Sequence, residues 1–107
     1  MVINLLREIQ TALERAGRTE DEILFVTDGT YSSSWLDFKD QIADLTYNNS
    51  YGLVEINVNL KIVGYQWWLE RYTYDGNEWW VYKTCPKNPA FPGSLMVKYE
   101  LGKNPLI

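Results

Sequence analysis

The chain contains no histidine, and this absence removes several kinds of active site. Histidine is the commonest general base and the imidazole ligand of catalytic zinc and of most haem sites. Ser-His and Cys-His catalysis are therefore impossible within this chain. The single cysteine, Cys85, likewise excludes an intramolecular disulfide and every multi-cysteine zinc or iron–sulfur site. We expect neither a metal nor another cofactor.

Long apolar runs and an excess of basic residues are also missing. No stretch approaches the roughly 20 apolar residues of a membrane span, and no signal-peptide pattern opens the sequence. Together with the lone cysteine, this predicts a cytoplasmic protein that does not use the membrane as a partner. Ten Lys and Arg stand against 14 Asp and Glu, a net charge of −4, so we do not expect nucleic acid as a partner.

The 107 residues are 46% hydrophobic, which is enough for one α+β domain over residues 1–107. Apolar residues at helical spacing predict helices at 2–16, ended by Gly17, and at 35–45, begun by the N-cap Ser34. Apolar runs and alternation predict strands at 23–26, 54–62, 66–74, 77–84 and 95–101, and turn formers predict a loop at 47–52. The order αβαββββ indicates a mainly antiparallel sheet with two helices on one face.

Aromatic residues make up 15% of the chain, and half of them lie between residues 65 and 82. The dipeptide Asp75-Gly76 in this segment predicts a β-hairpin. Each arm carries a pair of tryptophans, Trp67-Trp68 and Trp79-Trp80. Because adjacent strand residues point to opposite faces, each pair places one indole on each side of the sheet. The helices can cover only one side, so the C-terminal segment, a second subunit or solvent must meet the other.

The length of the turn decides which of these residues share a face. A two-residue loop places Tyr72 opposite Trp79, Arg71 opposite Trp80 and Leu69 opposite Tyr82. A three-residue loop shifts one arm and pairs Leu69 with Val81, and we favour it because it brings aliphatic residues together. This register sets six hairpin residues on the second face, and with the neighbouring Arg71 they form the predicted binding surface. The seven residues are Trp68, Glu70, Arg71, Tyr72, Glu78, Trp80 and Tyr82.

Three functions compete for this surface. Trp, Tyr and Arg dominate protein–protein hot spots, so a non-catalytic protein-binding module is the leading hypothesis, and a homodimer through this face is a variant of it. The planar side chains also suit a platform for sugars or single-stranded nucleic acid, formed by Trp68, Trp80 and Tyr82. Glu70 and Glu78 would lie about 7–8 Å apart, near the carboxylate spacing of an inverting glycosidase, which gives the weakest hypothesis, a hydrolase.

A second candidate surface is acidic. Residues 20–44 contain seven acidic residues, with Lys39 as the only base. Such a run is usually a solvated face, but it can also attract a basic partner. The candidate residues of this acidic surface are Glu20, Asp21, Glu22, Asp37, Asp40 and Asp44.

Residues 66–86 combine a Trp-Leu-Glu-Arg arm, a Tyr-Asp-Gly turn and a Glu-Trp-Trp arm, with Ser-Trp-Leu-Asp-Phe upstream at 34–38. In this pattern the chain resembles small uncharacterised proteins of bacterial genomes and their phages, over about residues 20–86. The resemblance transfers no functional residue. It implies a bacterial or phage-infected cell, where such accessory proteins commonly bind a host protein. Some small acidic phage proteins block the nucleic-acid site of a defence nuclease, as anti-CRISPR proteins do, and the acidic surface would serve such mimicry.

Overall fold

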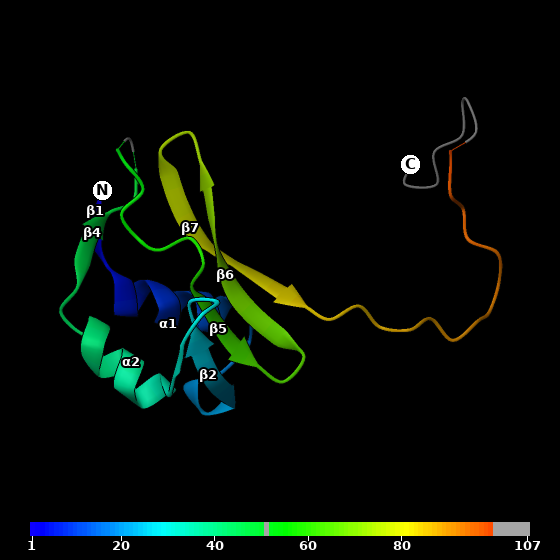
Figure 1. Ribbon diagram of the computed structural model, residues 1–107, viewed down its shortest axis with the longest axis horizontal. Coiled ribbons are helices and arrows are strands. Elements are labelled where there is room, and N and C mark those ends of the chain that lie inside the picture. Colours follow the sequence, from blue (N-terminus) through cyan, green and yellow to red (C-terminus); the bar gives the residue numbers. More distant parts are fainter. Residues whose placement is uncertain (51, 100–107) are drawn as a thin grey trace.

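The computed structural model describes residues 1–50 and 52–99, and the structural statements below refer to this part of the chain (Figure 1). It has the predicted α+β architecture. In chain order the elements are β1 (Val2–Asn4), α1 (Leu5–Arg15), the 3₁₀ helix η1 (Glu20–Glu22), β2 (Ile23–Thr27), β3 (Ser32–Ser33), α2 (Trp35–Ile42), β4 (Thr46–Asn48), β5 (Lys61–Gly64), β6 (Trp67–Tyr74) and β7 (Asn77–Thr84). β1 pairs with β4, and the other five strands form an antiparallel sheet in the order β3-β2-β5-β6-β7.

Helix α1 begins and ends at recognisable sequence signals. The side chain of Asn4 accepts a hydrogen bond from the amide of Arg7 at 2.9 Å and so caps the first turn. Gly17 has a φ of 70° and supplies the left-handed residue that follows the last turn, as predicted. The helix starts at Leu5 rather than at the predicted residue 2, because the segment before Asn4 is a strand.

β1 and β4 form a two-stranded ribbon that the sequence did not predict. Val2 pairs with Asn48, and Asn4 pairs with Thr46. The predicted loop at 47–52 therefore begins inside a strand. Tyr47, at the centre of β4, is buried, so the ribbon adds an aromatic side chain to the core.

Helix α2 begins at the predicted cap, where the hydroxyl of Ser34 accepts a hydrogen bond from the amide of Asp37 at 3.1 Å. It ends at Ile42 rather than at the predicted residue 45. The carbonyls of Ala43 and Leu45 accept hydrogen bonds, at 3.0 and 2.9 Å, from the residues that start α1. These bonds turn the chain out of the helix and into β4.

Residues 53–60 do not form a strand, although the alternation of apolar residues predicted one over 54–62. Only the four residues of β5 are in a strand. The amides of Glu55 and Ile56 donate to the carboxylate of Glu78, at 3.0 and 3.2 Å, and not to a neighbouring strand. Ile56 is buried in the core and Leu60 packs against the core, so this segment is held by two apolar side chains and by a distant carboxylate.

The β6–β7 hairpin forms as predicted, but in the two-residue register. Asp75 and Gly76 have φ values of 50° and 80°, the two left-handed residues that a type I′ turn requires. Tyr72 therefore lies opposite Trp79. The three-residue register that the aliphatic residues favoured is wrong.

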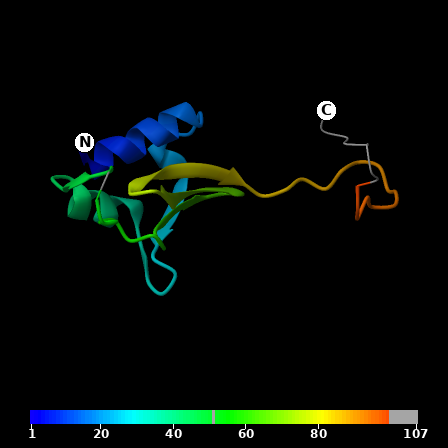
Figure 2. The same cartoon turned by 90° about the horizontal axis from the view of Figure 1, so that it is seen from above.

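Strand alternation divides the five-stranded sheet into a core face and an open face. Figure 2 shows α1 on one side of the hairpin. The core contains one apolar stripe from each helix and one set of alternating strand residues, including Val26, Ile62, Trp67, Leu69 and Trp80. Gly64 lets the indole of Trp67 lie against the neighbouring strand, because a Cβ at this glycine would stand 2.0 Å from the ring.

The predicted C-terminal strand at 95–101 is not observed in the described residues. Residues 85–99 contain no helix or strand, and residues 100 and 101 lie outside the described part. Figure 1 shows this segment leaving the domain beyond the end of β7. Leu95 and Val97 are about nine-tenths exposed, at 87% and 92%, so their alternation does not come from packing within this domain.

Candidate functional site

The seven residues of the predicted binding surface do not share one face. Trp68, Glu70 and Tyr72 lie on the open face, whereas the other four alternate onto the side of Trp67 and Leu69. The prediction of one exposed surface is therefore wrong for Arg71, Glu78 and Trp80, which are all buried. Tyr82 lies at the border, where its hydroxyl accepts a hydrogen bond from Arg18 Nε at 3.0 Å.

The buried Arg71 forms a cluster with groups from three other elements of the chain, α1, β4 and β7. Its guanidinium donates to Glu8 at 3.1 Å, to Glu78 at 2.8 Å and to the hydroxyl of Tyr47 at 3.1 Å. The guanidinium carbon also lies 5.4 Å from the ring centre of Tyr47 and 4.8 Å from that of Trp80, within cation–π range. We call Glu8, Tyr47, Arg71 and Glu78 the arginine cluster.

The arginine cluster places two carboxylates around one guanidinium. The Glu78 side chain is almost fully buried, and its charge is also stabilised by the two amides at Glu55 and Ile56. Burial, together with the hydrogen bond to Glu8, raises the pKa of the Tyr47 hydroxyl, so the phenol remains a donor to that carboxylate. The cluster thus ties α1, β4, β6, β7 and residues 55–56 together.

Sequence reasoning missed the arginine cluster because its members are far apart in the chain. Glu8 falls in the predicted helix at 2–16 and Tyr47 in the predicted loop at 47–52, and 63 residues separate Glu8 from its partner Arg71. The one local sign of an ion pair is that Glu78, beside the turn on β7, and Arg71, on β6, lie in facing strands of the same hairpin. It becomes informative only when the register is known.

The hydrolase hypothesis does not fit the positions of its two carboxylates. Glu70 and Glu78 lie on opposite faces of the sheet, so no substrate can lie between them. Glu78 is engaged in the arginine cluster. Glu70 accepts a hydrogen bond from Trp68 Nε1 at 2.7 Å and lies 3.8 Å from the ammonium of Lys83. Among the described residues, no three Cys, Asp or Glu side chains are grouped as metal ligands would be.

The open face is a continuous surface of aromatic and apolar side chains with a few charges. The strand register aligns Phe25, Val63, Trp68 and Lys83 in one row, then Thr27, Lys61, Glu70 and Val81, and then Tyr72 and Trp79. None of these ten side chains is buried. Tyr72 is 52% exposed and Trp79 is 38% exposed, and their ring centres lie 5.1 Å apart. Each tryptophan pair thus gives one indole to the core and one to the open face, as predicted.

The acidic surface is smaller than its composition indicated. Glu20 accepts hydrogen bonds from Lys39 and from Trp35 Nε1, both at 2.8 Å. These contacts, chiefly the one with Lys39, lower the pKa of Glu20. Glu22 pairs with Arg18 at 3.0 Å. The remaining exposed carboxylates, which form no salt bridge with a described residue, are those of Asp21, Asp37, Asp40 and Asp44.

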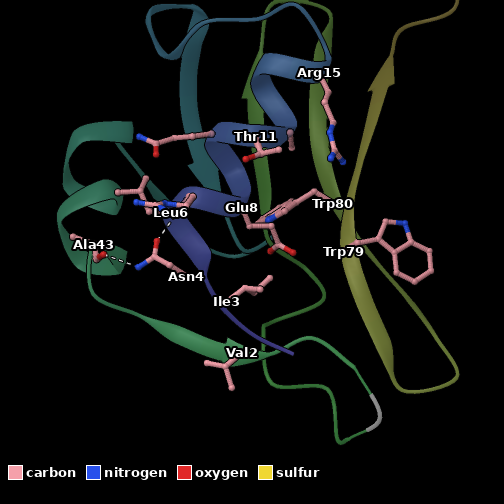
Figure 3. A pocket seen from close by; sticks show the side chains of 13 residues that line it. Val2, Ile3, Asn4, Leu6, Glu8, Thr11, Arg15, Ala43, Trp79 and Trp80 are labelled. Carbon is pink, nitrogen blue, oxygen red and sulfur yellow. Dashed lines mark hydrogen bonds between the residues drawn. The ribbon is translucent and has the colours of Figure 1, made fainter.

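A groove of about 900 Å³ runs beside β7 (Figure 3). Its walls come from β1, from α1 and from Trp79 and Trp80. These two tryptophans point to opposite faces of the sheet, so a groove that touches both lies at the outer edge of β7. Its polar lining includes Glu8, Thr11 and Arg15.

Comparisons with family models, with curated proteins and with solved structures found no match. In the described part of the chain, no helix is long and apolar enough to cross a membrane. The candidate functional surfaces of this chain are therefore defined by its own geometry: the open face and the groove at the edge of β7.

Proposed function

We propose that the protein is a non-catalytic protein-binding module whose contact surface is the open face of the sheet. The observation that carries this proposal is the unburied aromatic surface centred on Tyr72, Trp79 and Trp68. Ordinary surface positions rarely gather Trp, Tyr and Phe, which are the residues that anchor protein interfaces. Rigid aromatic rings also lose little conformational entropy on binding.

The charges on the open face indicate the chemistry of the partner. Lys61 and Lys83 flank the aromatic centre, and the only carboxylate among the ten residues is Glu70, which Trp68 and Lys83 already engage. The face therefore carries a net charge of +1, although the whole chain carries −4. A protein surface with an apolar centre and carboxylates at its rim would complement it. The resemblance to bacterial and phage proteins adds a host protein as the proposed partner.

Comparative affinity capture from a bacterial host lysate tests this proposal. The test variant is Tyr72→Ser/Trp79→Ser, which removes two aromatic groups from the open face. The control is Tyr31→Ser/Leu36→Ser, which removes two apolar groups that lie outside this face and are more exposed than Tyr72 and Trp79, at 76% and 72%. Both variants should unfold in urea at nearly the wild-type midpoint.

We expect one or more host proteins to bind the wild type and the control but not the test variant. A typical aromatic hot spot costs at least about 2 kcal/mol when truncated, so the affinity should fall roughly thirtyfold or more. Equal capture by all three proteins would refute the open face as the contact surface. A second variant, Asp37→Lys/Asp40→Lys, tests the alternative that the acidic surface binds the partner. Loss of the partner in this variant alone would move the function there.

A further inference from the structure

β7 is the last strand of the sheet, and its outer edge has unpaired backbone groups. In a hairpin closed by a two-residue turn, the two residues that flank the turn are hydrogen-bonded to each other. On each strand, the next residue and every second residue after it turn their backbone groups away from the partner strand. By this rule Glu78, Trp80, Tyr82 and Thr84 turn their N–H and C=O groups away from β6. The amide of Glu78 indeed donates outward, to the carbonyl of Asn49 at 3.0 Å.

The rest of this edge has no such cover. Among the described residues, no backbone or side-chain acceptor is found for the outward amides of Trp80, Tyr82 and Thr84. The strand also lacks proline, which natural edge strands use to prevent pairing with another chain. An exposed edge of this kind is a template for an added strand.

The groove beside β7 has the position and the lining that an added strand needs. It follows the outer edge, with Val2 toward the hairpin turn and Arg15 toward the C-terminal end of β7 (Figure 3). Its wall on α1 includes the apolar side chains of Leu6 and Ala12. A strand in this groove would bind the backbone of β7 and place alternate side chains against α1.

The C-terminal segment of this chain has the sequence of such a strand. Leu95, Val97 and Tyr99 alternate with Met96 and Lys98, and the segment contains no proline. All five side chains are exposed, so the period of two serves no packing within the domain. We propose that residues 94–99 of one copy pair, antiparallel, with the outer edge of β7 of a second copy.

The direction of the C-terminal segment favours a second copy over the same chain. Figures 1 and 2 show residues 85–99 continuing away from the domain past the end of β7. The linker carries Pro86, Pro89 and Pro92, and proline-rich segments behave as extended, semi-rigid spacers of about 3.1 Å per residue. Such a spacer carries the segment away from its own strand.

When the C-terminal segment continues β7 in a straight line, one symmetric arrangement of two copies allows it to pair with the partner's β7. Two copies related by a two-fold axis place each C-terminal segment antiparallel to the partner's β7, and the axis passes between the two linkers. Val97 then lies opposite Tyr82 and Tyr99 opposite Trp80, with their side chains toward α1. Lys98 lies on the open-face side, diagonal to Lys83. This mutual exchange of C-terminal segments leaves most of the open face free, so it does not depend on the proposed function.

Crosslinking of mixed isotopic copies tests this exchange. Full-length unlabelled and ¹⁵N-labelled proteins are unfolded, mixed, refolded together and treated with an amine-reactive crosslinker. We expect a dimer in analytical ultracentrifugation and Lys98–Lys83 links that join one light copy to one heavy copy. Links within single isotopic copies only would overturn the proposal, because the segment would then fold back on its own β7. A monomer at every concentration would also overturn it.

Two proline variants provide the matched comparison. In the proposed dimer, the amide of Val97 donates a hydrogen bond to the partner's β7. Val97→Pro removes this bond from both C-terminal segments and should weaken the dimer roughly tenfold or more. Ala90→Pro changes the linker only and should leave the dimer intact. Val97 is 92% exposed, so the domain itself should unfold as in the wild type. A dimer that survives Val97→Pro would show that another surface, such as the open face, joins the copies.

Discussion

Replacing Arg71 with methionine should be among the most damaging single changes in this protein. Methionine fills part of the same space but leaves the buried carboxylate of Glu78 and the largely buried one of Glu8 without their cation. The side chains of these two glutamates are 1% and 16% exposed, so water cannot replace the guanidinium at Glu78. Breaking a buried ion pair by removing one partner costs about 3–5 kcal/mol. A domain of this size is stable by only about 5–15 kcal/mol, so the loss should lower the urea midpoint strongly.

The double variant Arg71→Met/Glu78→Gln separates this cause from lost packing. Glutamine removes the buried charge but keeps an oxygen that can accept from the amide of Ile56. The double variant should therefore be more stable than Arg71→Met, although it carries one more substitution. Urea unfolding followed by tryptophan fluorescence measures both free energies. A loss below about 1 kcal/mol in Arg71→Met, or no recovery in the double variant, would refute the view that an uncompensated buried charge causes the damage.

Three further changes test other parts of the fold. Gly64→Ala should cost about 1–3 kcal/mol, because the new Cβ would meet the Trp67 ring at 2.0 Å, whereas Gly93→Ala, with open space around it, should cost almost nothing in thermal unfolding. Gly76→Ala should cost about 1–2 kcal/mol, because its φ of 80° is unfavourable for a residue with a Cβ, and the same assay measures it. Glu20→Gln should lower stability at neutral pH and flatten the acid dependence. The pKa of Glu20 is lowered in the folded state, so its contribution is present above the ordinary value of 4.5 and is lost as the pH falls through the folded value; an unchanged slope of stability against pH would contradict this.

Local signals predicted most of the elements, and long-range contacts explain most of the errors. Ser34 and Gly17 marked helix ends correctly because a cap depends only on neighbouring residues. The strand predicted over 54–62 failed because a carboxylate from β7 binds the amides that a strand ladder would have used. The prediction placed Asn4 inside a helix because the pairing of β1 depends on β4, more than forty residues away.

The candidate surface required the hairpin register, which the aromatic residues alone could not decide. A one-residue slip exchanges the two faces of one arm, and either arrangement gives each face aromatic rings. The arginine cluster distinguishes the two arrangements. In the observed register Arg71 and Glu78 share the core face and lie 2.8 Å apart, whereas the slipped register would place them on opposite faces.

The energetic consequence of that slip explains why the open face has its composition. A slipped arm would bury either Arg71 or Glu78 without the other, at a cost of several kcal/mol, whereas exchanging one indole for its neighbour changes the buried apolar area little. The buried ion pair therefore fixes which tryptophan of each pair faces the core. Trp67 and Trp80 become core residues on the same face as Arg71, and Trp68 and Trp79 are left on the open face. The aromatic surface proposed to bind a partner is thus positioned by charged residues on the opposite side of the same two strands.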